Sequence, residues 1–172
     1  MTKPLIISLL RFASSICNNK DIRAFCNVVF TEYDQGNTVI YSTNGHVAIR
    51  IVVPNQEMQA HTYTIKSIDN AYKTGLETLL EPVIDEIRRP PIEKIFAEAT
   101  NKFEDNKIGL DVNYLYLISS GLIKLSKDLG TKARGIEFHK TSKDKANFIR
   151  YPIYTIENEL IEVLIAIMPM KL

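Results

Sequence analysis

The sequence predicts an α+β domain of two similar halves, each a helix followed by an antiparallel meander of strands, with an extra helical linker between them. Two segments, residues 4–18 and 111–129, place apolar side chains at helical spacing. Each is followed by runs of β-branched and aromatic residues that turn-forming residues separate. We therefore divide a single domain, 1–172, into a first half (1–65), a helical linker (66–107) and a second half (108–172).

The first half begins with an amphipathic helix over residues 4–18, which Pro4 starts. One face is apolar and carries Leu5, Leu9, Phe12, Ala13 and Ile16. The opposite face is polar and weakly basic, and it carries Ser8, Arg11, Ser15 and Asn18. We expect four strands after this helix, at 23–32, on both sides of a turn within 38–53, and at 61–65.

The hairpin within residues 38–53 is the strongest strand signal in the chain. Val39, Tyr41 and Ile49 suit pleated strands, and Asn44-Gly45 is a dipeptide that accepts positive φ in a two-residue turn. The hairpin would present Thr43 and His46 beside its turn.

The linker gives weaker signals. Ser67 is the expected N-cap of a helix that carries Ile68, Ala71 and Tyr72, although Gly75 weakens this helix. The Arg-Arg-Pro-Pro segment at 88–91 must interrupt any helix, and residues 92–103 suit a second one.

The second half repeats the order of the first. Asp111 is the expected cap of a helix with an apolar seam of Val112, Leu115, Ile118, Leu122, Leu125 and Leu129. Three strands are expected after it, at 135–140, 146–154 and 160–169. Helix and meander thus occur twice, in a repeat of about sixty residues.

Charge and cysteine content narrow the class of protein. Twenty-one basic and twenty acidic side chains nearly balance, so any nucleic-acid contact must come from a local basic face. Cys17 and Cys26 lie in apolar segments and indicate reduced core residues. With no signal peptide and no long apolar run, we expect a cytoplasmic protein without membrane contact.

Enzymatic and metal-dependent functions find little support. The three histidines, His46, His61 and His139, lie on separate elements without ligand spacing, and no phosphate-binding glycine loop or nucleophile motif occurs. We therefore expect no enzyme activity, metal or cofactor. Two readings stay open: a nuclease-like cluster among the acids of residues 85–98, and base stacking by the tyrosines.

Several segments resemble the bacterial DNA polymerase III beta subunit, the sliding clamp family. RAFCNVVFTE (23–32) and STNGHVAI (42–49) are similar to that family's middle domain, and IGLDVNYLYLI (108–118) and IMPMKL (167–172) to its last domain. RPPIEKIF (89–96) is similar to the segment that links clamp domains. The resemblance implies a DNA-clamp-like fold in a shortened, single-domain version.

The resemblance also implies a hydrophobic pocket for clamp-binding-motif peptides of polymerase or loader proteins. The matching positions are Arg23, Cys26, Thr43, Gly45, His46, Val47, Ala48, Met168, Pro169, Met170, Lys171 and Leu172. The family's Asp-Gly-His-Arg-Leu is Asn-Gly-His-Val-Ala at 44–48 here, which removes one acid, one base and one large apolar wall. The pocket could form within a chain or between neighbouring chains.

The family's third implication is a homo-oligomeric ring around double-stranded DNA, held without reading its sequence. The matching basic groups are Arg11, Lys20, Lys124, Lys127, Lys132 and Arg134. Several copies would have to assemble head to tail to close such a ring. The alternatives are a clamp-derived regulatory or decoy protein that binds clamp partners or a clamp without encircling DNA, and a small nucleic-acid-binding or hydrolytic protein.

Overall fold

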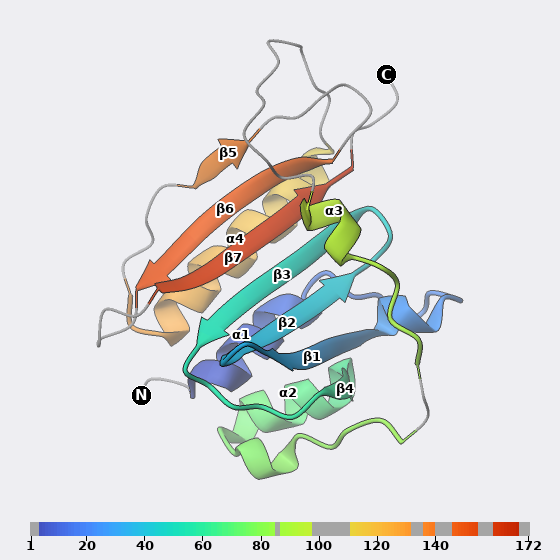
Figure 1. Cartoon of the computed structure of the whole chain (residues 1–172), viewed down its shortest axis with the longest axis vertical. Helices are drawn as coiled ribbons and strands as arrows, with labels where there is room; N and C mark the ends of the chain where they lie inside the picture. The colour runs from blue at the N-terminus through green and yellow to red at the C-terminus, as the bar shows by residue number, and fades with distance from the viewer. Residues whose placement is uncertain are drawn as a thin grey trace.

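One antiparallel sheet organises the chain, in a computed structural model that describes residues 4–84, 87–97, 111–131, 136–139, 146–154 and 160–168. Its strand order is β4-β1-β2-β3-β7-β6-β5. The strands are β1 (Val28–Asp34), β2 (Asn37–Thr43), β3 (Val47–Pro54), β4 (His61–Thr64), β5 (Glu137–His139), β6 (Asn147–Tyr154) and β7 (Leu160–Ile167). The α+β prediction is confirmed, and apart from the start of β1 the strands lie close to the expected ranges (Figure 1).

The two halves meet at the centre of the sheet, where β3 and β7 pair antiparallel. Ala48 lies opposite Ala166, and Ile49 opposite Ile165. From this seam the meander β3-β2-β1 runs one way and β7-β6-β5 runs the other. A meander thus lies on each side of the β3–β7 seam within a single sheet.

Two long helices, α1 (Leu5–Ser14) and α4 (Val112–Asp128), cover one face of the sheet, behind it in Figure 1. Leu9 and Leu10 of α1 and Ile118 and Leu125 of α4 pack in the same core as the strand residues that point to this face. Asp111 caps α4 as expected, because its Oδ1 accepts a hydrogen bond from the backbone N–H of Asn113 at 2.8 Å.

Helix α2 (Ile65–Thr74) lies beside α1, although the sequence placed it in the linker. Its N-cap is Thr64 rather than Ser67, since Thr64 Oγ1 accepts a hydrogen bond from the Ser67 N–H at 3.1 Å. Gly75 ends the helix at φ +76°, in the left-handed region that favours glycine. A short 3-10 turn follows at Glu77–Leu79. No helix in the described ranges is long and apolar enough to cross a membrane.

The linker then crosses to the other face of the sheet, where α3 (Glu93–Ala97) lies in front of the strands in Figure 1. Ile92 and Phe96 are buried against Phe148, with 6.1 Å between the two phenylalanine ring centroids. Burying each of these side chains contributes roughly 1.5–3 kcal/mol. The linker is therefore part of the packed domain, and the sheet separates it from the long helices.

The outer edge of β4 is covered by the start of this crossing segment. The Val83 N–H donates to the Thr62 carbonyl oxygen at 2.7 Å, and Tyr63 forms an antiparallel bridge with Pro82. Proline lacks an N–H, so this position cannot extend the sheet further. At the opposite end of the sheet, β5 is the last strand.

Candidate functional site

The side chain of Asn44, the residue before the two central residues, holds the hairpin turn together. Asn44 Oδ1 accepts hydrogen bonds from the N–H groups of His46 (3.0 Å) and Val47 (2.8 Å). The Asn44 N–H donates to the Val47 carbonyl oxygen at 3.1 Å, so Gly45 and His46 are the two central residues of the turn. Gly45 has a positive φ of +87°. The prediction of a two-residue turn is correct, but its placement on Asn44-Gly45 is wrong by one residue because the Asn44 side chain fixes the start of the turn.

Arg23 braces this turn from outside. Its guanidinium makes a two-pronged ion pair with Asp21, at 2.9 and 2.8 Å, and Nη2 also donates to the Asn44 carbonyl oxygen at 3.0 Å. The hydrogen bonds from Arg23 lower the pKa of Asp21 to about 2. The φ of +87° favours glycine at position 45, and a Cβ there would also displace the Arg23 guanidinium from the turn.

The expected strand at 23–32 is wrong at its start. Residues Ala24–Asn27 form a 3-10 helix, η1, and strand pairing begins only at Val28. Cys26 is completely buried there, and burial raises the pKa of its thiol. This 3-10 helix follows Arg23, whose side chain reaches back to the hairpin. It also places Cys26 in the core and outside the pocket lining.

An apolar hollow of about 440 Å³ lies beside the hairpin on the linker side of the sheet. Its residues come from the hairpin, the linker and the end of β7: Phe25, Thr43, Gly45, His46, Val47, Ala48, Pro90, Pro91, Ile92, Lys94, Ile95, Ala166 and Met168. The cross-strand pair Ala48 and Ala166 leaves room for it, because neither side chain extends beyond a methyl group. We call this hollow the hairpin pocket.

Six of the residues selected from the sequence line the hairpin pocket within one chain: Thr43, Gly45, His46, Val47, Ala48 and Met168. The Met168 N–H donates to the His46 carbonyl oxygen at 2.9 Å, which joins the end of β7 to the hairpin. Arg23 and Cys26 do not line the pocket, and of the two Arg23 contacts the hairpin, at the Asn44 carbonyl oxygen. Pro169, Met170, Lys171 and Leu172 lie outside the described residues.

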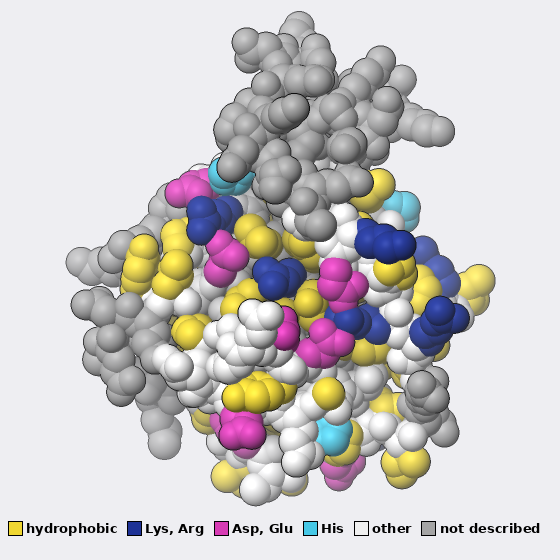
Figure 2. Space-filling model, viewed as in Figure 1, with side chains coloured by type: hydrophobic (Ala, Val, Ile, Leu, Met, Phe, Trp, Pro, Cys, Tyr) yellow, Lys and Arg dark blue, Asp and Glu magenta, His cyan; other side chains and the backbone are white. Residues whose placement is uncertain are grey.

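Sequence reasoning missed the pocket's other wall, which the linker supplies. Pro90, Pro91 and Ile92 lie over the sheet here, and Lys94 and Ile95 follow on α3. A signal was present, because a double proline followed by apolar residues at 92 and 95 suits an extended segment leading into a packed turn. In Figure 2, hydrophobic and basic side chains gather around α3 and the hairpin turn.

Arg89 fastens this wall to the sheet. Its Nη2 pairs with Glu32 of β1 at 2.7 Å and with Glu93 at the start of α3. The guanidinium carbon also lies 4.4 Å from the centroid of the Tyr41 ring. The Arg89 side chain therefore links the linker to β1 and β2. Arg89 directly precedes Pro90, the first linker residue that lines the pocket.

The mouth of the pocket combines an apolar floor with a few polar groups. His46 and Lys94 are exposed, and the His46 ring stacks on Tyr114 with 6.0 Å between ring centroids. Thr43 Oγ1 is already used inside the hairpin, since it donates to Val47 O at 2.9 Å and accepts from Gly45 N–H at 3.0 Å. His46 and Lys94 are therefore the groups that could donate hydrogen bonds to a bound chain.

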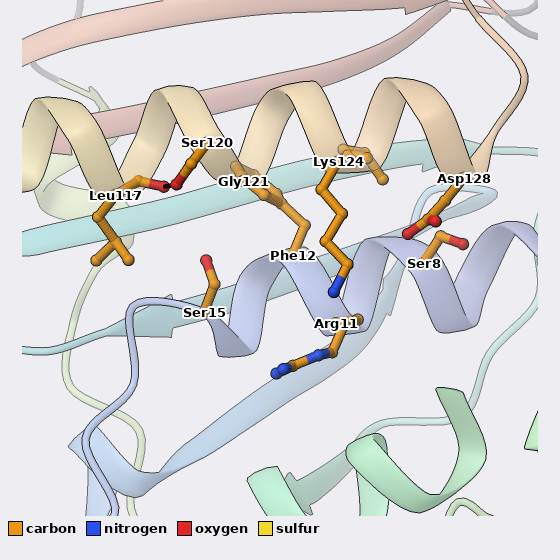
Figure 3. A pocket seen from close by; sticks show the side chains of 10 residues that line it. Ser8, Arg11, Phe12, Ser15, Leu117, Ser120, Gly121, Lys124 and Asp128 are labelled. Atoms are coloured by element: carbon orange, nitrogen blue, oxygen red, sulfur yellow. Dashed lines mark hydrogen bonds between the residues drawn. The ribbon is translucent and has the colours of Figure 1, made fainter. Parts of the chain in front are cut away.

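Two of the predicted DNA-contacting residues, Arg11 and Lys124, line a smaller hollow of about 220 Å³ between α1 and α4 on the other face (Figure 3). Arg11 forms an ion pair with Asp69 of α2 at 2.9 Å. Lys124 Nζ lies 4.9 Å from the centroid of the Tyr72 ring, and Tyr72 donates to Asp128 at 2.7 Å. Burial and the Asp128 carboxylate raise the pKa of Tyr72 to about 12.

The other basic candidates differ from this pair. Lys20, in the turn after α1, and Lys127, in the last turn of α4, are exposed. Lys132 and Arg134 lie outside the described residues. Among the described residues, exposed lysines thus occur together with an arginine that an aspartate neutralises.

Three further residues of the helix layer differ from, or add to, what the sequence predicts. Ser8, expected on the exposed face, is buried beside α4, and Val112, expected on the seam, is exposed. The helices approach closely at Gly121, where a Cβ would lie 2.9 Å from the Phe12 ring. Across the described ranges, no group of three or more His, Cys, Asp or Glu side chains could hold a metal ion.

Comparison with known proteins identifies the fold. No protein-family model and no curated protein matches the sequence. The structure matches the DNA polymerase sliding clamp of Pseudomonas aeruginosa with a TM-score of 0.65 and 13% identity, over 96% of this chain and 64% of that one. The fold is that of bacterial sliding clamps.

Two more solved structures agree. The sliding clamp of Bartonella birtlesii bound to griselimycin gives a TM-score of 0.67 at 13% identity, over 97% of this chain and 64% of that one. The beta subunit of Thermotoga maritima gives 0.59 at 9% identity, over 99% and 65%. This chain therefore corresponds to less than two-thirds of the length of these clamps, and the resemblance seen in the sequence is confirmed at the level of the fold.

Proposed function

We propose that this chain is a sliding-clamp-like processivity factor in DNA replication, without enzyme activity of its own. The hairpin pocket would capture a short apolar segment of a polymerase or loader protein, and several copies would form a ring around double-stranded DNA. The observation that carries the proposal is the convergence of the hairpin, the linker and the end of β7 on one apolar hollow within a single chain.

The pocket has the properties that peptide capture needs. Its floor is made of small side chains and its linker wall of Ile92 and Ile95, so apolar anchors of a peptide can enter. Met168 is 44% exposed, and its flexible thioether can adapt to anchors of different shape. His46 and Lys94 at the mouth would bind backbone carbonyl or carboxylate oxygens of the same segment.

The helix layer supports the second part of the proposal. It lies on the opposite face of the sheet, so DNA and a captured peptide would not compete for space. Phosphates would meet Lys20 and Lys127 through sequence-independent, salt-sensitive attraction. Repeating this modest charge around a ring would compensate for the near-neutral charge of each copy.

A regulatory or decoy protein that captures clamp partners without encircling DNA is the second candidate. Two observations favour it. The β4 edge is covered by Pro82 and Val83, which removes one site for joining sheets into a ring. Arg11 is already paired with an acid, which weakens the attraction for phosphates.

Binding of a fluorescent clamp-binding peptide from a bacterial polymerase, followed by anisotropy, tests the pocket. Ile95→Asp places a charge on the pocket wall and should weaken binding at least tenfold, about 1.4 kcal/mol. Leu76→Asp, at an exposed leucine outside the pocket, is the matched control and should bind like the wild type. Equal affinities for the wild type and Ile95→Asp would refute the assignment of the pocket.

A topological assay separates the two candidates. A ring should remain on circular double-stranded DNA through a high-salt wash and leave when the circle is cut. A protein that only captures partners should wash off circular and linear DNA alike, while it still binds the peptide.

A further inference from the structure

The hollow of about 220 Å³ between α1 and α4, which we call the α1–α4 hollow, contains hydrogen-bonding groups that the fold does not use. Ser8 of α1 and Ser15, the residue that follows this helix, both line it. The hydroxyl oxygen of each is buried and has no hydrogen-bond partner among the described residues. Buried polar groups without a partner are uncommon in native structures, so these two hydroxyls indicate a place for water or for a ligand.

The two ends of the α1–α4 hollow differ in charge, because the two helices run in opposite directions (Figure 3). Ser15 lies at one end and faces Gly121, where an added Cβ would lie 3.5 Å from Ser15 Oγ. Ser8 lies at the other end, which also contains the Asp128 carboxylate (Figure 3). The Ser15 end has no carboxylate in its lining, and an anion would therefore be repelled less there.

Two positive charges, those of Arg11 and Lys124, lie in the middle of the hollow (Figure 3). The Arg11 guanidinium carbon and Lys124 Nζ lie 6.0 and 4.9 Å from the centroid of the same Tyr72 ring. Arg11 contacts both Asp69 and Ser14 through Nη1, which leaves Nε and Nη2 for another acceptor. Lys124 forms no ion pair with a described residue. Both side chains can thus still donate to an anion.

We infer that the α1–α4 hollow binds a single phosphate group at its Ser15 end. One phosphate oxygen accepts a hydrogen bond from the Lys124 ammonium, and another accepts from Nε or Nη2 of Arg11. The Ser15 hydroxyl donates to a third. Hydrogen bonds between charged groups are about twice as strong as neutral ones, so the two cations supply most of the affinity. At the acidic end, the Ser8 hydroxyl is left to water.

The site goes beyond the proposed function, in which DNA phosphates meet Lys20 and Lys127 on the outside of the helix layer. Here the phosphate lies between the helices, and its binding requires neither a ring nor a captured peptide. The hollow is smaller than the roughly 300 Å³ at which pockets for drug-sized ligands begin, but it admits one phosphate group. Such a group can belong to the DNA backbone or to a free phosphate compound, because the chemistry of recognition is the same.

An NMR titration of the isotope-labelled full chain with inorganic phosphate, with sodium chloride holding the ionic strength constant, tests the site. The amide signals of Ser15 and Gly121 should shift along a saturable curve, with a dissociation constant on the order of 1 mM. Lys124→Gln should weaken binding about tenfold and Ser15→Ala about fivefold. Asp69→Asn should strengthen binding, because Asp69 competes with the phosphate for Arg11. Ser8→Ala is the matched control: it removes the other unpartnered hydroxyl and should bind like the wild type.

Three results would overturn the inference. Shifts at Ser15 and Gly121 that are absent or do not saturate would mean that the hollow holds only water. Equal affinities of the wild type and Lys124→Gln would exclude the ammonium as a ligand, and equal losses in Ser8→Ala and Ser15→Ala would exclude the assigned end. Because the titration contains neither DNA nor peptide, the proposed function can fail without affecting it.

Repeating the titration with a short DNA duplex present identifies the source of the phosphate. If backbone phosphates occupy the site, the duplex should raise the apparent dissociation constant of inorganic phosphate, and Lys124→Gln should abolish this competition. If the site serves a free phosphate compound, the dissociation constant should stay the same with and without the duplex. Either result supports a phosphate site in the α1–α4 hollow.

Discussion

Replacing Arg89 with alanine should loosen the linker wall of the hairpin pocket while the sheet stays folded. The substitution removes ion pairs to Glu32 and Glu93 and the contact over the Tyr41 ring. The Arg89 side chain is 22% exposed, so the ion pairs are partly screened and contribute about 0.5–1 kcal/mol together. The cation–π contact adds about 0.5–1 kcal/mol. The linker should lose about 1–2 kcal/mol of local stability.

Amide hydrogen exchange measures this loss where it occurs. The N–H groups of Ile95 and Phe96 donate to the Ile92 carbonyl oxygen, so they exchange only when the linker opens. A loss of about 1–2 kcal/mol should accelerate their exchange roughly 5- to 30-fold. Amides in the central strands β3 and β7 should keep their protection, because they do not contact Arg89.

Arg89→Lys is the matched control. It keeps the positive charge but loses the planar guanidinium that bridges two carboxylates and lies over the ring, so its exchange rates should fall between those of the wild type and Arg89→Ala. Unchanged exchange at residues 95 and 96 in Arg89→Ala would refute the anchoring role. Equal acceleration in all strands would also refute it, because the effect would then be global.

Three further changes probe the remaining features. Asp69→Asn frees Arg11 from its ion pair, so affinity for double-stranded DNA should rise several-fold and its salt dependence should steepen, as measured by anisotropy at several salt concentrations. Gly45→Ala introduces a strained positive φ and a collision with Arg23, so chemical denaturation should show a loss of about 1–2 kcal/mol. The Asp21 carboxylate has its pKa lowered to about 2, so the stability it contributes is present above its ordinary pKa near 3.9 and is lost as pH falls toward 2. Asp21→Asn should therefore flatten the acid limb of the stability profile, as followed by circular dichroism.

The sequence predicts those elements whose local signals agree with their tertiary environment. The hairpin strands of 38–53 and the strands at 146–154 and 160–169 alternate or run apolar because they are buried in the sheet. Asp111 caps α4 as predicted because its side chain satisfies a backbone N–H locally. The conformation of such features depends little on distant residues, so it can be predicted from the sequence.

The errors occur where a distant residue decides the local conformation. Arg23 reaches the carbonyl of Asn44, twenty-one residues away, and the segment between them starts as a 3-10 turn although its residues favour a strand. Ser8 looks polar and exposed on a helical wheel, but α4 covers it because Gly121 allows the helices to approach closely. Neither effect has a local signal, since each depends on packing between segments far apart in sequence.

The linker wall of the pocket was not predicted from the sequence. Its position on the opposite face of the sheet from the long helices also means that peptide binding and DNA binding can be tested separately. The linker residues 87–97 combine prolines and charges that suit a solvent-exposed connection, but Ile92 and Phe96 are buried on the sheet face away from the long helices. Each face has its own cluster of buried side chains, with the sheet between them. Ile95 and Lys127 lie on opposite faces and do not contact each other, so the effects of substituting them should be additive. The double variant Ile95→Asp with Lys127→Glu should therefore lose peptide binding and DNA binding by the same factors as the two single variants, and a coupling energy well above about 0.5 kcal/mol would show that the faces communicate through the sheet.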